Sequence, residues 1–191
     1  MVGGLLFGGG GYYALSLFLL KNDNPLLLLK ALFCFAIVIA FFIRNSAFRI
    51  DKRVISFIVT LAHVSVPLLV QPYGIATIPL RWSIFIFIVG LLLSSFSVVD
   101  LWKSFGLLPA NRGIVSGGVY SLIRHPIYLG YFLLFIGVIS HYLSLLNFVL
   151  FILFIVLTVL RIRLEEFLLQ KDENYLLYSK KVRFKLIPWV F

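Results

Sequence analysis

Acidic side chains, histidine and cysteine are all scarce in this chain of 191 residues. It has seven Asp and Glu residues, three His and one Cys, against 17 Lys and Arg. One cysteine cannot form an intrachain disulfide or a cluster of thiolate ligands, so both are excluded. No His, Cys, Asp and Glu residues occur together at metal-ligand spacing, so we predict no metal site. The isolated His63 and His141 are expected to be hydrogen-bonded residues of the core or the membrane interface.

Charged residues of both signs are also few, and this decides the broad class of the protein. They make up 13% of the chain, whereas hydrophobic residues make up 62% and the mean hydropathy is +1.08. A soluble domain is nearer half apolar and a quarter charged. The composition therefore predicts an integral membrane protein. A net charge of +10 could indicate nucleic acid, but in so apolar a chain we expect basic residues to face anionic lipid and expect no nucleic acid partner.

Apolar segments of membrane-spanning length recur along the whole chain. Each crossing needs about 20 apolar residues, so the pattern predicts an all-α, polytopic bundle of about five to six transmembrane helices. The last segment is too long for one crossing, and His141, Ser144 and Asn147 near its middle predict the tight turn of a helical hairpin. The apolar segments are residues 2–20, 25–43, 54–80, 82–99 and 127–160.

Glycine and proline predict irregular ends for two of these segments. The first begins without Lys or Arg, so we interpret it as an uncleaved helix rather than a signal peptide. Gly4 and Gly8 would let a second helix approach it closely, and a loosely ordered glycine-rich end is the alternative. In the third segment, prolines predict that the helix ends near Leu69 to Gln71 and that residues 72–80 form an extramembrane connection.

Basic residues cluster after the second, fourth and fifth apolar segments. With alternating crossings these clusters fall on one side of the membrane, and the positive-inside rule makes that side cytoplasmic. We therefore expect both chain ends, the 100–125 segment and the 161–191 tail to face the cytoplasm, with the protein in the inner membrane of the cell. The corresponding division is transmembrane helices in residues 1–99 and a region carrying the candidate site in residues 100–191.

The first polar group within the apolar chain is the Arg-His-Pro segment, residues 124–126. Arg124 and His125 directly precede a long apolar run, where charged or polar side chains are costly unless a ligand or the headgroup layer needs them. Pro126 fixes the backbone and suits the first turn of the following helix. The Arg-His-Pro segment is therefore predicted at the water–membrane boundary, where a water-soluble cofactor could meet a lipid-soluble substrate.

The second polar group follows the hairpin. Arg161 and Glu165 are four residues apart, so they share one face of a helix, and Glu166 is adjacent. A tail with Tyr175 and Tyr178 comes next. Residues 173–188 could cover the site, held to anionic headgroups by Lys180, Lys181, Arg183 and Lys185. The alternative is an amphipathic helix that only lies in the interface.

Together these groups resemble a known enzyme family. A Gly-x-Tyr-x-x-x-Arg-His-Pro-x-Tyr-x-Gly stretch precedes a helical hairpin, and Arg-x-x-x-Glu-Glu, Tyr-x-x-Tyr and a terminal Ile-Pro follow. This order is similar to that of the isoprenylcysteine carboxyl methyltransferases and their relatives, the phospholipid N-methyltransferases. The likeness covers about residues 100–191. The N-terminal half matches only in being helical and membrane-embedded.

The resemblance implies a small membrane methyltransferase that uses S-adenosylmethionine, releases S-adenosylhomocysteine and binds the donor in its C-terminal half. Glu165 matches the acid placed against the cofactor, and Arg161 matches an arginine at the substrate end. Glu165 or Glu166 could pair with the donor's ammonium, and Arg124 or His125 could bind its carboxylate. The implied catalytic residues are Arg161, Glu165 and Glu166. The implied cofactor contacts are Arg112, Gly113, Ile114, Val115, Tyr120, Arg124, His125, Pro126, Ile127, Tyr128 and Glu165.

The acceptor and two other functions remain open on the sequence alone. Enzymes that methylate prenylcysteine usually have a histidine near Arg112, where this chain reads Pro-Ala-Asn-Arg-Gly. The acceptor could be a prenylcysteine-like carboxylate, a phospholipid amine or another small lipophile. A nicotinamide-dependent membrane sterol or lipid reductase is one alternative class, although such proteins are usually much longer. A small non-enzymatic membrane subunit is the other.

Overall fold

The computed structural model describes residues 12, 25–43, 45–188 and 190. The fold is mostly helical, as predicted, with one unexpected pair of two-residue strands. The helix expected in residues 2–20 and the Gly4–Gly8 pair lie outside the described residues. The α-helices are α2 (Pro25–Ile43), α3 (Val54–Ser65), α4 (Leu80–Leu101), α5 (Pro126–Ile139), α6 (Leu145–Leu169) and α7 (Glu173–Lys181), and the antiparallel strands are β1 (Arg49–Ile50) and β2 (Ala110–Asn111).

The boundaries of α3, α4 and the hairpin follow the predicted turn residues. Helix α3 continues as a short 3-10 helix to Leu69, and α4 begins directly after Pro79. Ser144 caps α6 because its hydroxyl accepts from the backbone N–H of Asn147 at 3.2 Å. The side-chain amide of Asn147 then donates to the carbonyls of Gln71 and Tyr142. The predicted turn is therefore confirmed, and its polar residues also hold the preceding connection.

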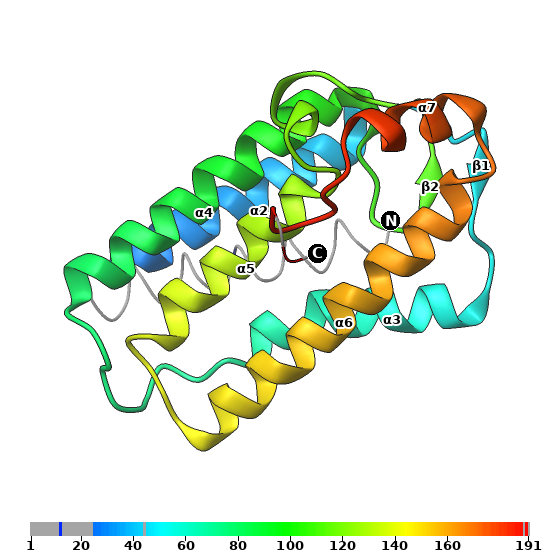
Figure 1. Ribbon diagram of the computed structural model, residues 1–191. Coiled ribbons are helices and arrows are strands. Elements are labelled where there is room, and N and C mark those ends of the chain that lie inside the picture. The colour runs from blue at the N-terminus through cyan, green and yellow to red at the C-terminus, as the bar shows by residue number, and fades with distance from the viewer. Residues whose placement is uncertain (1–11, 13–24, 44, 189, 191) are drawn as a thin grey trace.

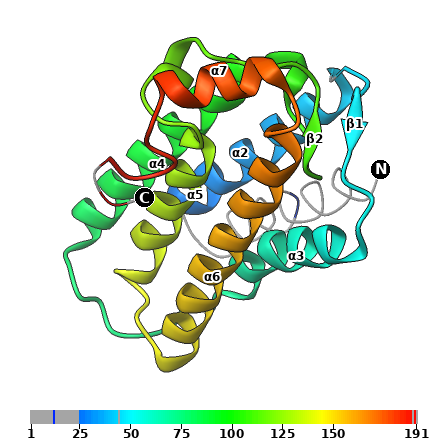
Figure 2. The same cartoon turned by 45° about the vertical axis from the view of Figure 1, so that its right-hand side comes forward.

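The connections between the helices gather at two opposite ends of the molecule (Figures 1 and 2). At one end, the backbone N–H of Ile75 donates to the carbonyl of Leu143 at 2.8 Å, which joins the α3–α4 and α5–α6 connections. At the other end lie the β1–β2 pair, the long α4–α5 connection and α7. The segments that carry the predicted basic clusters therefore share one end of the bundle.

Helices α4 and α5 pack closely through small residues. A Cβ atom added to Gly130 would lie 2.7 Å from the backbone nitrogen of Ser94, and one added to Gly137 would lie 2.8 Å from that of Phe87. Gly90 of α4 faces Gly130 of α5 in the same way. Contacts this short leave no space for a side chain, so the backbones approach as they do at small-residue interfaces in membranes.

Two of the described helices, Leu80–Leu101 and Leu145–Leu169, are long and apolar enough to cross a membrane. Their outward faces carry large apolar side chains, including the half-exposed Phe85 and Phe96 on α4 and Phe148 on α6. Exposed apolar surface of this extent is unfavourable in water and favourable in lipid. The Val54–Leu69 and Pro126–Ile139 segments are apolar but shorter. The total of five to six crossings stays a prediction.

Candidate functional site

The Arg-His-Pro segment lies against the C-terminal tail. The backbone N–H of Arg124 donates to the carbonyl of Phe184 at 2.9 Å, and that of His125 donates to the carbonyl of Lys185 at 2.8 Å. Pro126 begins α5, where its missing N–H removes no helical hydrogen bond. These two backbone bonds fix the tail across the start of α5.

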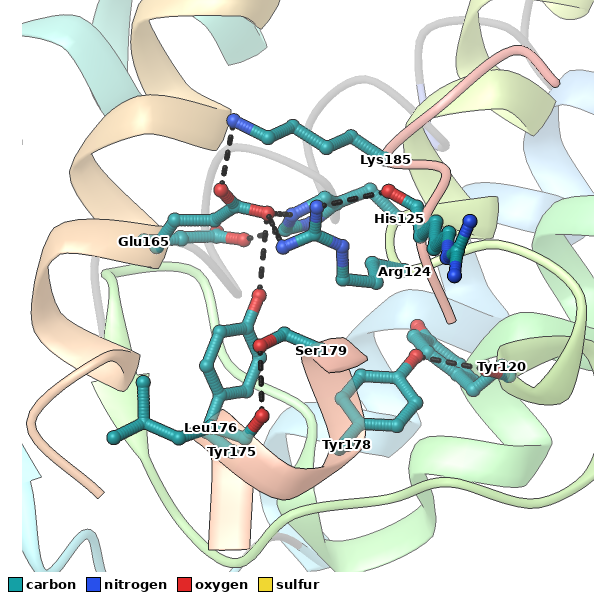
Figure 3. A network of polar contacts seen from close by, with 11 residues as sticks. Tyr120, Arg124, His125, Glu165, Tyr175, Leu176, Tyr178, Ser179 and Lys185 are labelled. Carbon is teal, nitrogen blue, oxygen red and sulfur yellow. Dashed lines mark hydrogen bonds and ion pairs between the residues drawn. The ribbon is translucent and has the colours of Figure 1, made fainter. Parts of the chain in front are cut away.

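Glu166 of α6 is the centre of the polar contacts between these segments. Figure 3 shows four of the contacting side chains converging, those of Arg124, His125, Tyr175 and Lys185. Its carboxylate lies 2.7 Å from the guanidinium of Arg124, 3.3 Å from Nε2 of His125 and 2.9 Å from the ammonium of Lys185. The hydroxyl of Tyr175 donates to the same carboxylate at 3.3 Å. The Glu166 side chain is 4% exposed, so these partners replace the water that a carboxylate would otherwise require.

Glu165 lies on the adjacent face of α6 and has a different set of neighbours. It accepts a hydrogen bond from the hydroxyl of Tyr128. Its carboxylate is 3.6 Å from Nε of Arg161, one helical turn earlier, and 3.7 Å from Nδ1 of His125. The predicted shared face of Arg161 and Glu165 is therefore confirmed, and the two neighbouring glutamates contact different partners.

A cavity of about 130 Å³ opens between the α4–α5 connection, α5, α6 and α7. It brings together almost all of the residues that the resemblance implies for catalysis and cofactor binding. Pro126 and Glu166 are the two that do not line it, because Pro126 starts the helix and Glu166 faces the tail. The predicted residues that line the cavity are Arg112, Gly113, Ile114, Val115, Tyr120, Arg124, His125, Ile127, Tyr128, Arg161 and Glu165.

The α4–α5 connection is held over the cavity by polar contacts to both neighbouring segments. Nε of Arg112 donates to the carbonyl of Asn45 at 3.2 Å. The side-chain amide of Asn111 donates to Asp172 at 2.6 Å, and this hydrogen bond lowers the pKa of the Asp172 carboxyl. Gly113 follows with a φ of +108°, which side chains rarely adopt. Residues 112–115, which belong to no helix, therefore form part of the cavity wall.

Three tyrosines, Tyr120, Tyr175 and Tyr178, line the cavity, and Figure 3 shows how they lie relative to one another. Tyr175 and Tyr178 of α7 contact each other edge to face, and the hydroxyl of Tyr178 donates to the carbonyl of Tyr120 at 2.7 Å. Burial raises the pKa of Tyr178 to about 12 and raises the pKa values of Tyr120 and Tyr175 further. All three hydroxyls are therefore neutral donors at physiological pH.

Two cationic side chains of the cavity keep a buried nitrogen without a hydrogen-bond acceptor. These atoms are Nε of Arg124 and Nε of Arg161. Arg161 is otherwise held by the backbone carbonyl of Leu107, to which its Nη2 donates, and by the ring of Tyr128. Buried donors without an acceptor are uncommon in folded proteins and mark places where a polar ligand could bind.

Several residues of the site were not found by sequence reasoning. Val64 of α3 and Tyr131 of α5 line the cavity but stand within apolar runs where no motif distinguishes them. Lys185 was expected at anionic headgroups, whereas it pairs with Glu166. The sequence does indicate that a buried acid needs a cationic partner. It does not show that Lys185 is that partner, because the two residues meet only through the path of the C-terminal segment.

No group of three or more His, Cys, Asp and Glu side chains is arranged to hold a metal ion within the described residues. The carboxylates of Glu165 and Glu166 have arginine, histidine, lysine and tyrosine as their neighbours. This donor set suits a charged organic ligand better than a cation of high charge. The absence of a metal site stays a prediction for the whole chain.

A helical bundle with a charged cavity at one end of its apolar helices is the architecture of a membrane protein with a polar site at that end. A comparison with protein families specifies it further, because the family model described as phospholipid methyltransferase matches residues 80–172. This match, which covers α4, α5 and α6, confirms the resemblance drawn from the motifs. A search of curated proteins found no match.

Proposed function

We propose that this protein transfers a methyl group from S-adenosylmethionine to a lipophilic acceptor at the cytoplasmic surface of the membrane. The observation that carries the proposal is the cavity itself. It places Glu165, Arg124 and Arg161 around one space, next to the tyrosines of the tail, within or beside the region that matches the phospholipid methyltransferases.

The residues of the cavity fit the charges of the proposed donor. The methionine end of S-adenosylmethionine carries an ammonium and a carboxylate. Glu165 offers a carboxylate at the cavity wall for the ammonium, and Nε of Arg124 is a buried donor that a carboxylate could satisfy. Tyr120, Tyr175 and Tyr178 supply aromatic surface for the adenine. Glu166 is already bound by four partners, so in this proposal it shapes the site and does not contact the donor.

The sulfonium of the donor supplies an activated methyl group, so the protein's task is orientation and exclusion of water. Arg161 marks the other end of the proposed site: it pairs with Glu165 at 3.6 Å and lies over the ring of Tyr128, and Tyr131 and the apolar Val64 line the same cavity. In the proposal this end receives the acceptor, and Arg161 binds an anionic headgroup such as a carboxylate. A carboxylate acceptor needs no general base. An amine acceptor must lose a proton, and Glu165 or His125 would accept it.

The size of the cavity gives the tail a role in the proposal. Its volume of about 130 Å³ is below the roughly 300–1,000 Å³ of typical ligand pockets. Helix α7 and residues 182–188 would therefore move outward to admit the donor and return to cover it, which excludes water from the transfer. The donor would enter from the cytoplasm and the acceptor from the bilayer, because the helices around the cavity are apolar outside.

A transfer assay tests the proposal directly. Purified protein is incubated with S-adenosylmethionine labelled in its methyl group and with vesicles of a membrane lipid extract, and the labelled product is identified. Glu165→Gln should abolish labelling, whereas Glu173→Gln, which changes an exposed residue of α7, should leave it unchanged. Labelled lipid in the parent and in Glu173→Gln alone supports the proposal. No labelled lipid in the parent contradicts it.

A further inference from the structure

A histidine of α3 reaches the candidate site from the part of the chain that precedes residues 80–172. His63 is 2% exposed and lies in the core between α3 and α6. Its Nε2 is 3.0 Å from the hydroxyl of Thr158, and its Nδ1 is 3.5 Å from Nη1 of Arg161. The matching region begins at residue 80, so this contact is a contribution of the N-terminal half.

The hydrogen bonds around His63 fix where its proton lies. The hydroxyl of Thr158 donates to the carbonyl of Phe154 at 2.8 Å. Its single hydrogen is then used, so Thr158 accepts from His63, and Nε2 carries the proton. Nδ1 therefore presents a lone pair, which faces the guanidinium of Arg161. Arg161 therefore donates a hydrogen bond to His63, His63 donates to Thr158, and Thr158 donates to the backbone carbonyl of Phe154.

We propose that His63 is a positioning residue that sets the orientation of the Arg161 guanidinium, and the proposal rests on the proposed role of Arg161 at the acceptor end of the cavity. Nη2 of Arg161 donates to the carbonyl of Leu107, and the Nε edge faces Glu165 at 3.6 Å. His63 accepts at the remaining end, Nη1. The guanidinium is thus hydrogen-bonded at both Nη atoms and paired by charge with Glu165 at Nε, and a planar group held in this way cannot turn away from the cavity.

Ring packing holds His63 in place for this role. Its imidazole stacks on Phe154 with a centroid distance of 4.7 Å and meets the ring of Tyr128 edge-on at 5.7 Å. Tyr128 in turn lies under the guanidinium of Arg161 and donates to Glu165. His63 therefore supports both the cation at the acceptor end and the tyrosine that contacts the acid.

Two substitutions of similar polarity, His63→Asn and His63→Gln, distinguish a role of His63 in orienting Arg161 from a role in packing alone. The amide of His63→Asn lies near the position of Nδ1 and can still accept from Arg161, whereas the longer amide of His63→Gln lies near Nε2 and replaces the bond to Thr158. A positioning role predicts that His63→Asn keeps most of the acceptor affinity. His63→Gln should raise the apparent KM for lipid-extract vesicles about tenfold, with donor affinity unchanged, because a hydrogen bond to a charged group is lost.

A second readout does not depend on activity. Full-length protein is labelled with ¹⁵N-arginine, and the Nη resonances of Arg161 are assigned by their absence in Arg161→Lys. Slow rotation of a held guanidinium should keep the two Nη resonances separate in the parent and in His63→Asn. The resonances should merge in His63→Gln. Unchanged Arg161 resonances and vesicle KM in His63→Gln would overturn the proposal, as would equal losses in both variants. If the parent protein labels no lipid, the proposed function fails, while the resonances still decide whether His63 orients Arg161.

Discussion

The guanidinium of Arg124 lies 2.7 Å from the carboxylate of Glu166, which joins the start of α5 to the end of α6. Lys185 reaches the same carboxylate from the tail at 2.9 Å. One buried acid, Glu166, therefore contacts both the start of α5 and the C-terminal segment that carries Lys185. The two neighbouring glutamates of α6 differ in their surroundings. Glu166 contacts other side chains of the protein, whereas Glu165 lines the cavity.

We predict that Glu166→Gln releases the tail. Removing the charge leaves Arg124, whose side chain is 10% exposed, without its anionic partner, and breaking a buried pair costs about 3 kcal/mol. The unfolding midpoint in detergent should fall, and trypsin should cleave faster after Lys180 and Lys181. Glu173→Gln is the matched control on α7. Parent-like cleavage in Glu166→Gln would show that the backbone bonds alone hold the tail.

We predict that Glu165→Gln and His125→Ala each lose donor binding while the protein stays folded. Loss of the charge opposite the donor's ammonium should cost on the order of 2–5 kcal/mol, which is at least tenfold in affinity. Calorimetry in detergent measures the affinity, and thermal unfolding checks the fold. Glu165→Gln is the sharper variant, because His125 also lies 3.3 Å from Glu166. Donor affinity equal to that of the parent in both variants would exclude this cavity as the donor site.

We predict that Gly137→Val destabilises the packing of α4 against α5. Its Cβ would lie 2.8 Å from the backbone nitrogen of Phe87 and 2.9 Å from the carbonyl of Ser83, and backbone atoms cannot move aside locally. Overpacking of this kind costs about 1–3 kcal/mol. Thermal unfolding of Gly117→Ala provides the comparison, since a Cβ at Gly117 meets nothing within 4 Å. Equal midpoints for the two variants would argue against the close approach.

We predict that alkaline pH weakens the closure of the tail through Tyr178. Burial raises its pKa to about 12, whereas the unfolded value is about 10. The stability that its neutral form contributes is therefore complete below pH 10 and is lost as the pH rises from 10 to 12. In Tyr178→Phe the loss of the bond to Tyr120 should cost about 1 kcal/mol at pH 7. The difference in the free energy of unfolding between the parent and Tyr178→Phe, in which the titrations of other groups cancel, should shrink above pH 10. A difference that stays constant with pH would refute this role of Tyr178.

Local spacing predicted part of the site well. Arg161 and Glu165 share a face because helical geometry alone places positions four apart together. Pro126 marked the start of α5, and Ser144 and Asn147 marked the hairpin turn, because these residue types have local effects on the backbone. The mostly helical fold followed from the length of the apolar segments.

Long-range partners could not be predicted in the same way. In apolar helices nearly every face is hydrophobic, so periodicity does not show which face packs inward. The close packing of α4 against α5 at Gly130 and Gly137 was therefore not predicted. The pairing of Lys185 with Glu166 depends on the path of the tail, which backbone bonds to Arg124 and His125 determine. The contact between His63 and Arg161 joins residues 98 positions apart, and no local pattern encodes it.

Calorimetric titration of the full-length protein in detergent identifies the cofactor, with S-adenosylmethionine in one series and a reduced nicotinamide dinucleotide in the other. We predict saturable binding of S-adenosylmethionine that Glu165→Gln reduces at least tenfold, and no binding of the nicotinamide dinucleotide. Binding of the dinucleotide in place of S-adenosylmethionine would indicate a reductase and contradict the proposed function. Binding of neither ligand would contradict it as well, and would favour a non-enzymatic membrane protein.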